Sequence, residues 1–364
     1  MGALSVAGLL SVGLNVAPAA SPDSRAVSRA TVLVQLENYI GLSSDGAYVN
    51  VTVGSNLRFS GRLFIDGKYE MIRGVLDGSG SYTGTYGKQQ ASFGVVRGIE
   101  GEKFTLTSFG RTVVAYPRVS RTSSLYQEGY YTLLLKSTET DPTLPPGTGY
   151  AVARVKKGGQ ITLAGKAADG TVISVGSYLT RLPTYSLRFP LFTTLYAGKG
   201  TLSGSLSFGA DSFGGTLNWA KPWQKMGTYY RTGFSTELEL AGYRYKPPTT
   251  GRPVLTFPGG AGVALELSGG GLSSAVAEAG VLTVANKVLV LGTNFTRLKV
   301  GLNVKTGLFS GSFNYPQNNK TVKIVGAIYQ DSDEPEVSGY FRSPVQNGTG
   351  QCGGFTLKAP PATP

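Results

Sequence analysis

Short segments of alternating apolar and polar residues, separated by turn dipeptides, run along most of this chain. The turn signals include Asp45-Gly46, Asp66-Gly67, Asp77-Gly78, Asp169-Gly170 and Asn347-Gly348. Asp-Gly and Asn-Gly suit two-residue hairpins, because both central residues of such a turn need positive φ. The segment from Tyr48 to Val53 alternates with a period of two, which is typical of a half-buried strand. The pattern predicts antiparallel sheet throughout, with a helical turn indicated only over 275–279.

One unit, made of a strand, a glycine turn and a second strand with a glycine at its middle, recurs along the sequence. Its copies centre on 57–63, 159–166, 200–206 and 307–313. A glycine in mid-strand fits a bulge or a sharp bend where a sheet curls towards closure. We therefore predict an all-β chain of two or three small antiparallel meander barrels or twisted sandwiches in tandem.

Polar and proline-containing connectors divide the chain. Paired prolines in the stretch 246–253 stiffen an exposed linker, and 118–128 is a polar connector. We expect an apolar leader or N-terminal strand over 1–25. The predicted β domains cover 30–118, 126–247 and 253–358.

Residues 1–20 are apolar, and two interpretations of them stay open. The small-residue ending at 17–20 resembles a signal-peptidase site, which indicates export. Alternatively, the segment is an assembly strand that pairs with its own barrel or with the sheet edge of another copy. The alternating apolar residues of that strand are Leu10, Val12, Leu14 and Val16. No later segment is apolar enough to span a membrane as a helix.

Histidine and cysteine, which many enzymes use for catalysis or metal binding, are absent and nearly absent from the chain, respectively. The chain has no histidine, which excludes a Ser-His-Asp triad, a His-ligated zinc and a histidine base. A single cysteine, Cys352, excludes an intrachain disulfide and thiolate clusters. Glu237 and Glu239 have a spacing compatible with an acid/base pair, but solvated carboxylates on an outer strand face are the favoured interpretation. We predict that the chain is not an enzyme and has no catalytic residues.

The charge balance is basic. The chain carries 34 Lys and Arg against 21 Asp and Glu, a formal net charge of +13. This favours anionic partners such as acidic polysaccharide. The cations are spread thinly through the strands, so specific recognition of nucleic acid is not expected.

Aromatic and cationic residues gather between 219 and 245. Aromatic faces flanked by cations suit stacking on the rings of an acidic glycan. The predicted glycan-binding residues are Trp219, Trp223, Tyr229, Tyr230 and Arg231. The alternative is that these aromatics plug a barrel end or pack between units, as large aromatics usually do.

One acidic cluster stands out over 331–336. Its carboxylates could offer oxygen ligands to Ca²⁺, with Asp331, Asp333 and Glu336 as the metal-binding candidates. A solvated hairpin tip is the favoured interpretation. No other cofactor is expected.

An ordered series of short motifs runs along the chain. The motifs are Gly149-Tyr150-Ala151-Val152, Asp169-Gly170-Thr171, Phe189-Pro190-Leu191, Leu195 to Gly200, Leu217 to Pro222, Tyr243 to Pro248, Thr306 to Gly311 and Gly339-Tyr340-Phe341. This series resembles a glycine-rich β module found at the C-termini of large verrucomicrobial surface proteins. The resemblance covers about residues 30 to 357 and implies export and a cell-surface or matrix setting. That family has no established activity, so the resemblance assigns no functional residues.

These observations predict a secreted, non-catalytic structural or adhesive module of the cell surface. Its partners would be other copies of itself, through strand exchange, or cell-surface components. The alternative function is a carbohydrate-binding module for acidic glycans.

Overall fold

The computed structural model describes residues 37–361 except 87–88, 99–100, 109, 140, 142, 258 and 347. Within this part of the chain the elements are 25 β-strands and one short 3-10 turn, η1 (Lys157–Gly159). The prediction of an all-β fold is therefore confirmed. The helical turn indicated over 275–279 is wrong, because residues 276–279 belong to β19 (Val276–Leu282) and pair there with β18. Ladder pairing overrides the weak helical preference of its alanines.

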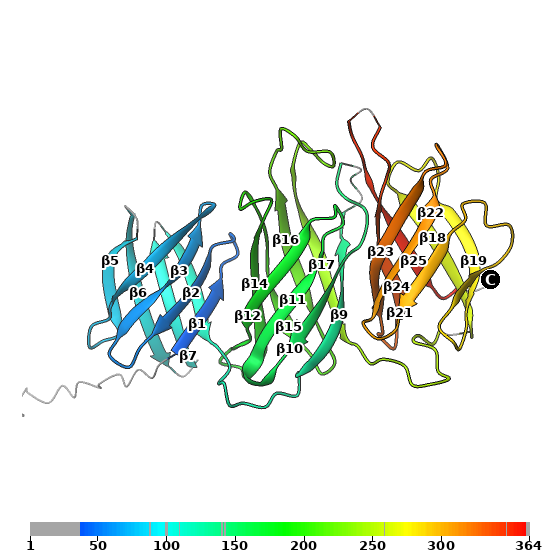
Figure 1. The fold of residues 1–364 in the computed structure, drawn as a ribbon. Helices are drawn as coiled ribbons and strands as arrows, with labels where there is room; N and C mark the ends of the chain where they lie inside the picture. Colours follow the sequence, from blue (N-terminus) through cyan, green and yellow to red (C-terminus); the bar gives the residue numbers. More distant parts are fainter. Residues whose placement is uncertain are drawn as a thin grey trace, which may run out of the picture.

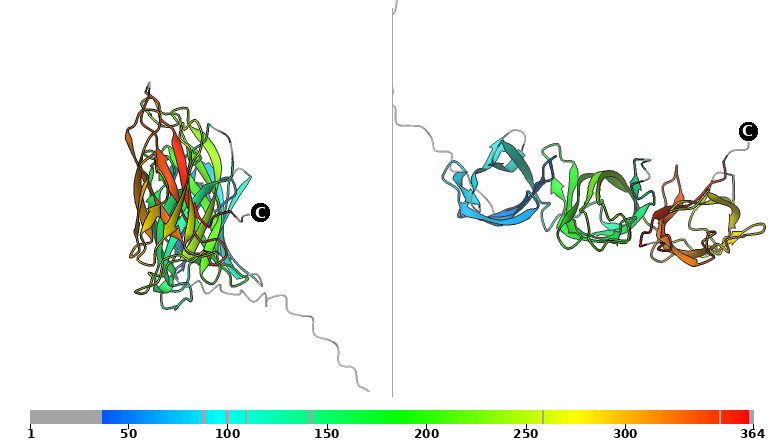
Figure 2. Two further views of the ribbon diagram at one scale, coloured as in Figure 1. Left: turned by 90° about the vertical axis from the view of Figure 1, so that its right-hand side faces the viewer. Right: turned by 90° about the horizontal axis from the view of Figure 1, so that it is seen from above.

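Three antiparallel sheets stand side by side in a row (Figure 1). Seen from above, each sheet curls into a nearly closed ring (Figure 2). In each ring the first strand pairs with both the second and the last strand, so the chain winds once around each barrel. Near closure leaves little sheet edge free for pairing with other chains.

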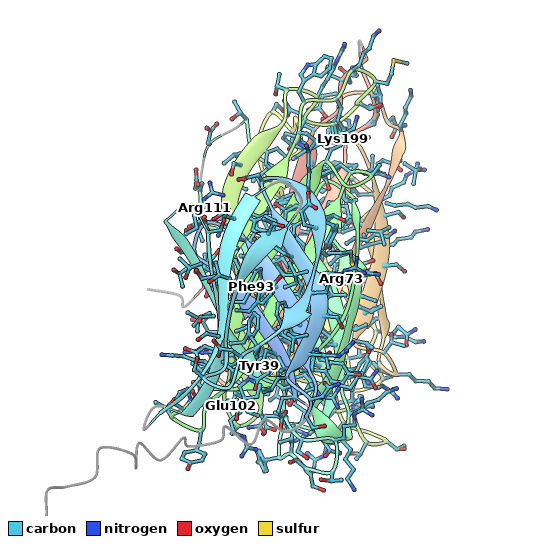
Figure 3. All side chains as sticks on the ribbon, turned by 90° about the vertical axis from the view of Figure 1, so that its left-hand side faces the viewer. Tyr39, Arg73, Phe93, Glu102, Arg111 and Lys199 are labelled. Atoms are coloured by element: carbon cyan, nitrogen blue, oxygen red, sulfur yellow. The ribbon has the colours of Figure 1, made fainter. Side chains whose placement is uncertain are left out.

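The first barrel is an up-and-down meander with a seam between its fourth and fifth strands. Its strands are β1 (Glu37–Leu42), β2 (Tyr48–Val53), β3 (Arg58–Ile65), β4 (Lys68–Val75), β5 (Ser81–Tyr86), β6 (Gln89–Gly98), β7 (Gly101–Ser108) and β8 (Arg111–Pro117). Asp66 and Gly67, which join β3 to β4, have φ of 49° and 76°, as the dipeptide predicts. The ring of Phe59 lies 5.2 Å from that of Phe93 and 6.1 Å from that of Phe104, so side chains fill the interior (Figure 3).

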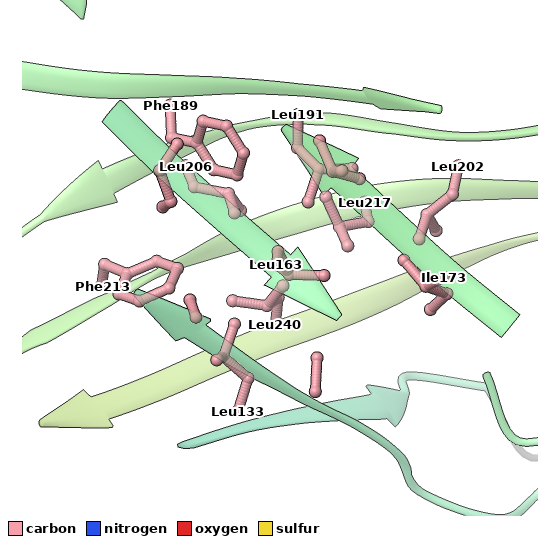
Figure 4. Close-up of a cluster of buried hydrophobic side chains, with 14 of the residues drawn as sticks. Leu133, Leu163, Ile173, Phe189, Leu191, Leu202, Leu206, Phe213, Leu217 and Leu240 are labelled. Atoms are coloured by element: carbon pink, nitrogen blue, oxygen red, sulfur yellow. The ribbon is translucent and has the colours of Figure 1, made fainter. Parts of the chain in front are cut away.

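The second barrel repeats this plan and adds one short strand at its seam. Its strands are β9 (Gly129–Ser137), β10 (Gly149–Val155), β11 (Gln160–Lys166), β12 (Val172–Tyr178), β13 (Thr180–Arg181), β14 (Leu187–Leu195), β15 (Gly200–Phe208), β16 (Ser212–Lys221) and β17 (Phe234–Arg244). Every second residue of these strands points inwards, and Figure 4 shows the apolar side chains meeting inside the ring. The interior is a packed core.

In the third barrel the seam, the gap in strand pairing, falls between the third and fourth strands and not between the fourth and fifth. Its strands are β18 (Gly262–Gly269), β19, β20 (Val288–Val290), β21 (Lys299–Asn303), β22 (Leu308–Asn314), β23 (Thr321–Tyr329), β24 (Glu336–Arg342) and β25 (Cys352–Lys358). Here three strands precede the seam and five follow it. A single bridge between Lys287 and Gly301 crosses that seam.

The recurring mid-strand glycines let neighbouring backbones approach closely. A Cβ atom on Gly61 would lie 2.3 Å from the carbonyl oxygen of Asn50, and one on Gly165 would lie 2.1 Å from that of Tyr150. The other two copies of the unit show the same close approach, at Gly204 and Gly311. The sequence predicts a bulge or a sharp bend at these glycines. The strand registers of Gly61 and Gly165 contain no extra residue, which excludes the bulge and leaves the bend. The tight curl of the sheet is what requires glycine.

The second and third barrels share a junction with a fully buried centre, where β9 and β10 lie against β23 and β24. A hollow of about 650 Å³ lies at its edge, lined by Tyr243, Lys246 and Gln330 among other residues. The fully buried Thr132 donates a hydrogen bond of 2.6 Å to the carbonyl oxygen of Ile328. Tyr130 and Tyr245 donate hydroxyl hydrogen bonds of 2.8 and 2.6 Å to carbonyl oxygens in the turn from β21 to β22. Lys136 and Glu336 form an ion pair across the same contact. This second junction is an interface of paired polar groups.

Candidate functional site: the groove between the first two barrels

One aromatic wedge and a backbone bridge between Arg118 and Thr180 join the first and second barrels. Phe192 of β14 packs against three rings of the first barrel: Tyr48 at 4.9 Å, Phe64 at 4.6 Å and Tyr69 at 6.3 Å between ring centroids. Burial in this contact raises the pKa of Tyr48 above its ordinary value. The wedge covers part of the facing surfaces and leaves a groove beside it.

The groove consists of two hollows that share a wall. One has a volume of about 700 Å³, the other about 480 Å³, and Asn50 and Thr52 line both. We call the continuous feature the first-junction groove. Its polar and aromatic lining includes Glu37, Asn38, Tyr48, Asn50, Thr52, Arg62, Tyr69, Arg118, Arg121, Tyr178 and Arg181.

Strand periodicity explains why polar side chains face this groove. In β2, alternate residues Val49, Val51 and Val53 are fully buried in the first barrel. Asn50 and Thr52 lie between them in sequence and therefore point outwards. The second barrel then roofs this outer face, which turns an ordinary strand surface into one wall of a groove.

Arginine dominates the charge of the groove. The guanidinium of Arg118 lies 4.5 Å from the ring centre of Tyr178, a cation–π contact that holds it at the wall. Three further guanidinium groups line the groove, those of Arg62, Arg121 and Arg181. Over the residues that the structure describes, none of the four forms an ion pair. The acidic side chain among the lining residues is Glu37.

The amide side chains of the groove are already ordered. Asn38 Nδ2 donates to Asn50 Oδ1 at 2.8 Å and to Thr52 Oγ1 at 3.2 Å. Side chains fixed in advance lose less conformational entropy when they bind a ligand. The wall of the first barrel therefore presents a preorganised polar surface beside the arginines.

This set of groups matches a particular ligand chemistry. Guanidinium pairs with carboxylate or sulfate through two parallel hydrogen bonds. Tyrosine rings offer flat apolar faces, and amides bond hydroxyl groups. An elongated, hydroxylated polyanion satisfies all three at once.

The residues predicted to bind glycan do not form one platform. Trp219 is fully buried in the second barrel, 4.6 Å from the ring of Phe234, so its predicted role in sugar stacking is wrong. Inward strand alternation on β16 takes precedence over the aromatic signal. Trp223, by contrast, is 62% exposed on the loop after β16, and Arg231 of the same loop is also exposed.

Tyr229 and Tyr230 belong to the second junction instead. Tyr229 donates its hydroxyl to the carbonyl of Ser343 at 2.9 Å, and the backbone N–H of Cys352 donates to the Tyr230 hydroxyl at 3.1 Å. Their rings are half-buried between the second and third barrels. Packing between units, the alternative named for these aromatics, describes both of them.

A buried polar cluster that sequence reasoning missed lies beneath that loop. Lys221 Nζ is 2.8 Å from Asp169 Oδ2 and donates to the carbonyl oxygen of Tyr229 at 3.0 Å. Tyr196 donates to the same carboxylate at 2.8 Å and accepts a hydrogen bond of 3.0 Å from Trp219 Nε1. Every polar group of the cluster has a partner, so it is a fixed support and not an open site.

Cys352 is fully buried next to this cluster. Burial raises the pKa of its thiol to about 12, and the nearby charge of Asp169 adds to the effect. A thiol that stays protonated and covered is a poor nucleophile. The side chain therefore acts as a small apolar residue of the last strand.

The predicted calcium ligands do not converge. Glu336 faces Lys136 of the second barrel, whereas Asp331 Oδ1 accepts the backbone N–H of Asp333 at 3.0 Å within the hairpin turn. Across the described residues, no three acidic, cysteine or histidine side chains come together as metal ligands.

The predicted assembly strand, with Leu10, Val12, Leu14 and Val16, lies outside the described residues. Its pairing stays a prediction. Among the residues described, no helix has the length and apolarity needed to cross a membrane.

No model of a known protein family matches the sequence, and no curated protein is similar to it. A crystal structure of a protein of unknown function from the DUF3598 family of Nostoc punctiforme is similar at 9% sequence identity. The match covers 65% of this chain and 97% of that chain with a TM-score of 0.19, which is too low to bear on function.

Proposed function

We propose that this chain is a non-catalytic cell-surface module that binds acidic polysaccharide in the first-junction groove. The observation that carries the proposal is a set of four guanidinium groups that form no ion pair with any described residue and lie beside ordered amides and tyrosine rings. The net charge of +13 supports it, because a basic protein attracts polyanions over a distance of several ångströms.

The surface setting is part of the proposal. It is supported by the apolar residues 1–20 with their small-residue ending, and by the resemblance to modules of bacterial surface proteins. The absence of histidine supports a binding role over catalysis.

The test compares affinities for a charged and a neutral oligosaccharide. We expect the full chain to bind hexagalacturonate, measured by titration calorimetry, and to leave maltohexaose unbound. A hydrogen bond to a charged group contributes about 1.5–3 kcal/mol. The triple variant Arg118→Gln, Arg121→Gln and Arg181→Gln should therefore bind at least about tenfold more weakly.

A second triple variant controls for charge alone. Lys299→Gln, Lys305→Gln and Lys323→Gln removes the same number of charges from exposed positions of the third barrel. It should bind within about twofold of the parent, since distant exposed charges are screened by salt. Equal loss in both variants, or no binding by the parent, overturns the proposal.

A further inference from the structure

The loop that joins β16 to β17 exposes apolar side chains at one end of the molecule. We call residues 222–233 the tip loop. Within it Trp223 is 62% exposed and Met226 is 91% exposed. The loop projects beyond the barrel at the top of Figure 1, next to the loop between β24 and β25.

The exposure is built into an ordered loop. Lys221, held by Asp169, fixes the carbonyl of Tyr229 from below. The backbone N–H of Gln224 donates to the carbonyl of Arg231 at 2.9 Å and closes the loop on itself. Trp223 and Met226 are thus held in solvent by a rigid frame, while the two tyrosines of the same loop are half-buried.

The two loops at this tip carry cations and no carboxylate, and the nearest exposed acids, Glu139 and Glu237, lie at the base of the tip loop. The sequences 222–233 and 343–351 contain no Asp or Glu, although the chain has 21 of them. Lys225 and Arg231 of the tip loop are exposed, and Lys199 lies at the same end (Figure 3). Lys199 belongs to the turn next to the tip loop, since a Cβ on Gly200 would lie 3.0 Å from Pro222.

We propose that the tip loop docks peripherally on the surface of an anionic lipid bilayer. Tryptophan is favoured at the boundary between headgroups and acyl chains, and methionine gains free energy when its apolar side chain leaves water. Lysine and arginine near the surface are attracted to anionic headgroups. An ordered apolar tip with Lys225 and Arg231 beside it presents both contributions to the same membrane surface.

A glycan platform at this loop is the competing interpretation, and two observations disfavour it. Trp219, which would extend such a platform, is fully buried. Met226 is the most exposed apolar side chain of the loop, and it offers a sugar neither a flat ring nor a hydrogen bond.

The test uses the intrinsic fluorescence of the full chain. The chain has two tryptophans, and because Trp219 is buried, a change in emission on docking reports on Trp223. With vesicles of equal parts phosphatidylcholine and phosphatidylglycerol we expect co-sedimentation and a blue shift. With vesicles of phosphatidylcholine alone we expect neither.

Matched variants separate the tip loop from general effects. Trp223→Ser with Met226→Ser should lower partitioning at least about tenfold. Tyr185→Ser removes a ring that is 81% exposed beyond the other end of β14 and should change nothing. Lys225→Gln with Arg231→Gln should weaken partitioning about fivefold per charge.

Several results would overturn the proposal. They are the absence of co-sedimentation with anionic vesicles, unchanged partitioning of the Trp223→Ser and Met226→Ser variant, and a blue shift with soluble hexagalacturonate but not with vesicles. The groove variant with three arginines replaced should bind vesicles like the parent. An equal loss in that variant would mean that net charge alone attracts the chain to lipid.

Discussion

The two junctions between barrels use the outer surfaces of similar sheets in different ways. At the second junction, buried threonine and tyrosine hydroxyls bond carbonyl groups of the next barrel. At the first, the ring of Phe192 packs against rings of the first barrel, and arginines that form no ion pair within the described part of the chain line the space beside it. Polar groups paired with each other hold barrels together, whereas polar groups left to water remain available for a ligand.

Replacing Lys221, the cation that supports the second junction, should lower the free energy of unfolding more than any other change considered below. Lys221→Met leaves the Asp169 carboxylate buried without its cation and removes the bond to Tyr229. Loss of one partner of a buried pair costs about 3–5 kcal/mol of unfolding free energy. Urea unfolding followed by circular dichroism measures it. The exposed Lys199→Met should stay within about 0.5 kcal/mol of the parent. Equal stability of both variants would contradict the role of the buried pair.

The next largest effect should come from alkaline pH, which lowers the stability of the chain by ionising buried groups at the second junction. Burial raises the pKa of Tyr245 and of Cys352 to about 12, from ordinary values of 10.0 and 9.0. The unfolded chain releases these protons first, so their contribution to stability is complete below pH 9 and is lost as pH rises towards 12. The urea midpoint should fall between neutral pH and about pH 11. Cys352→Ala should reduce that fall, and an identical pH dependence in the variant would contradict the assignment.

The same replacement of threonine by valine, made once at each junction, compares how much each hydroxyl contributes to stability. Thr132→Val keeps the side-chain shape and leaves the buried carbonyl of Ile328 unpaired, which costs about 1–3 kcal/mol. Thr52→Val in the open groove should cost at most about 0.5 kcal/mol, because water reaches that wall. Paired denaturation curves measure both. Equal costs would contradict the difference in burial between the two threonine hydroxyls.

Much of the fold could be predicted from local signals. The Asp66-Gly67 turn and the alternation of β2 each specify a hairpin or a strand without help from distant residues. The recurring glycines pointed to tight curling. Glycine is required because a Cβ on Gly61 would lie 2.3 Å from a neighbouring backbone oxygen. That close approach depends on the register between strands, which local signals do not reveal.

The groove could not be predicted in the same way. The alternation of apolar and polar residues in β2 predicts that Asn50 and Thr52 face outwards. It does not predict that a second barrel covers them. Arg118 and Arg181 come together because the chain bridges Arg118 to Thr180, a pairing between two domains. Aromatic clustering in the sequence pointed to Trp219, whose position on the inward face of β16 makes it part of the core.

Hydrogen–deuterium exchange with and without hexagalacturonate tests the central claim most directly, because it locates the ligand on the full chain. We expect slower exchange in segments 37–53, 117–123 and 176–195, which line the first-junction groove. Exchange in the second-junction segments 129–137 and 321–342 should stay unchanged. Protection confined to 219–245, or no protection at saturating ligand, would contradict the account.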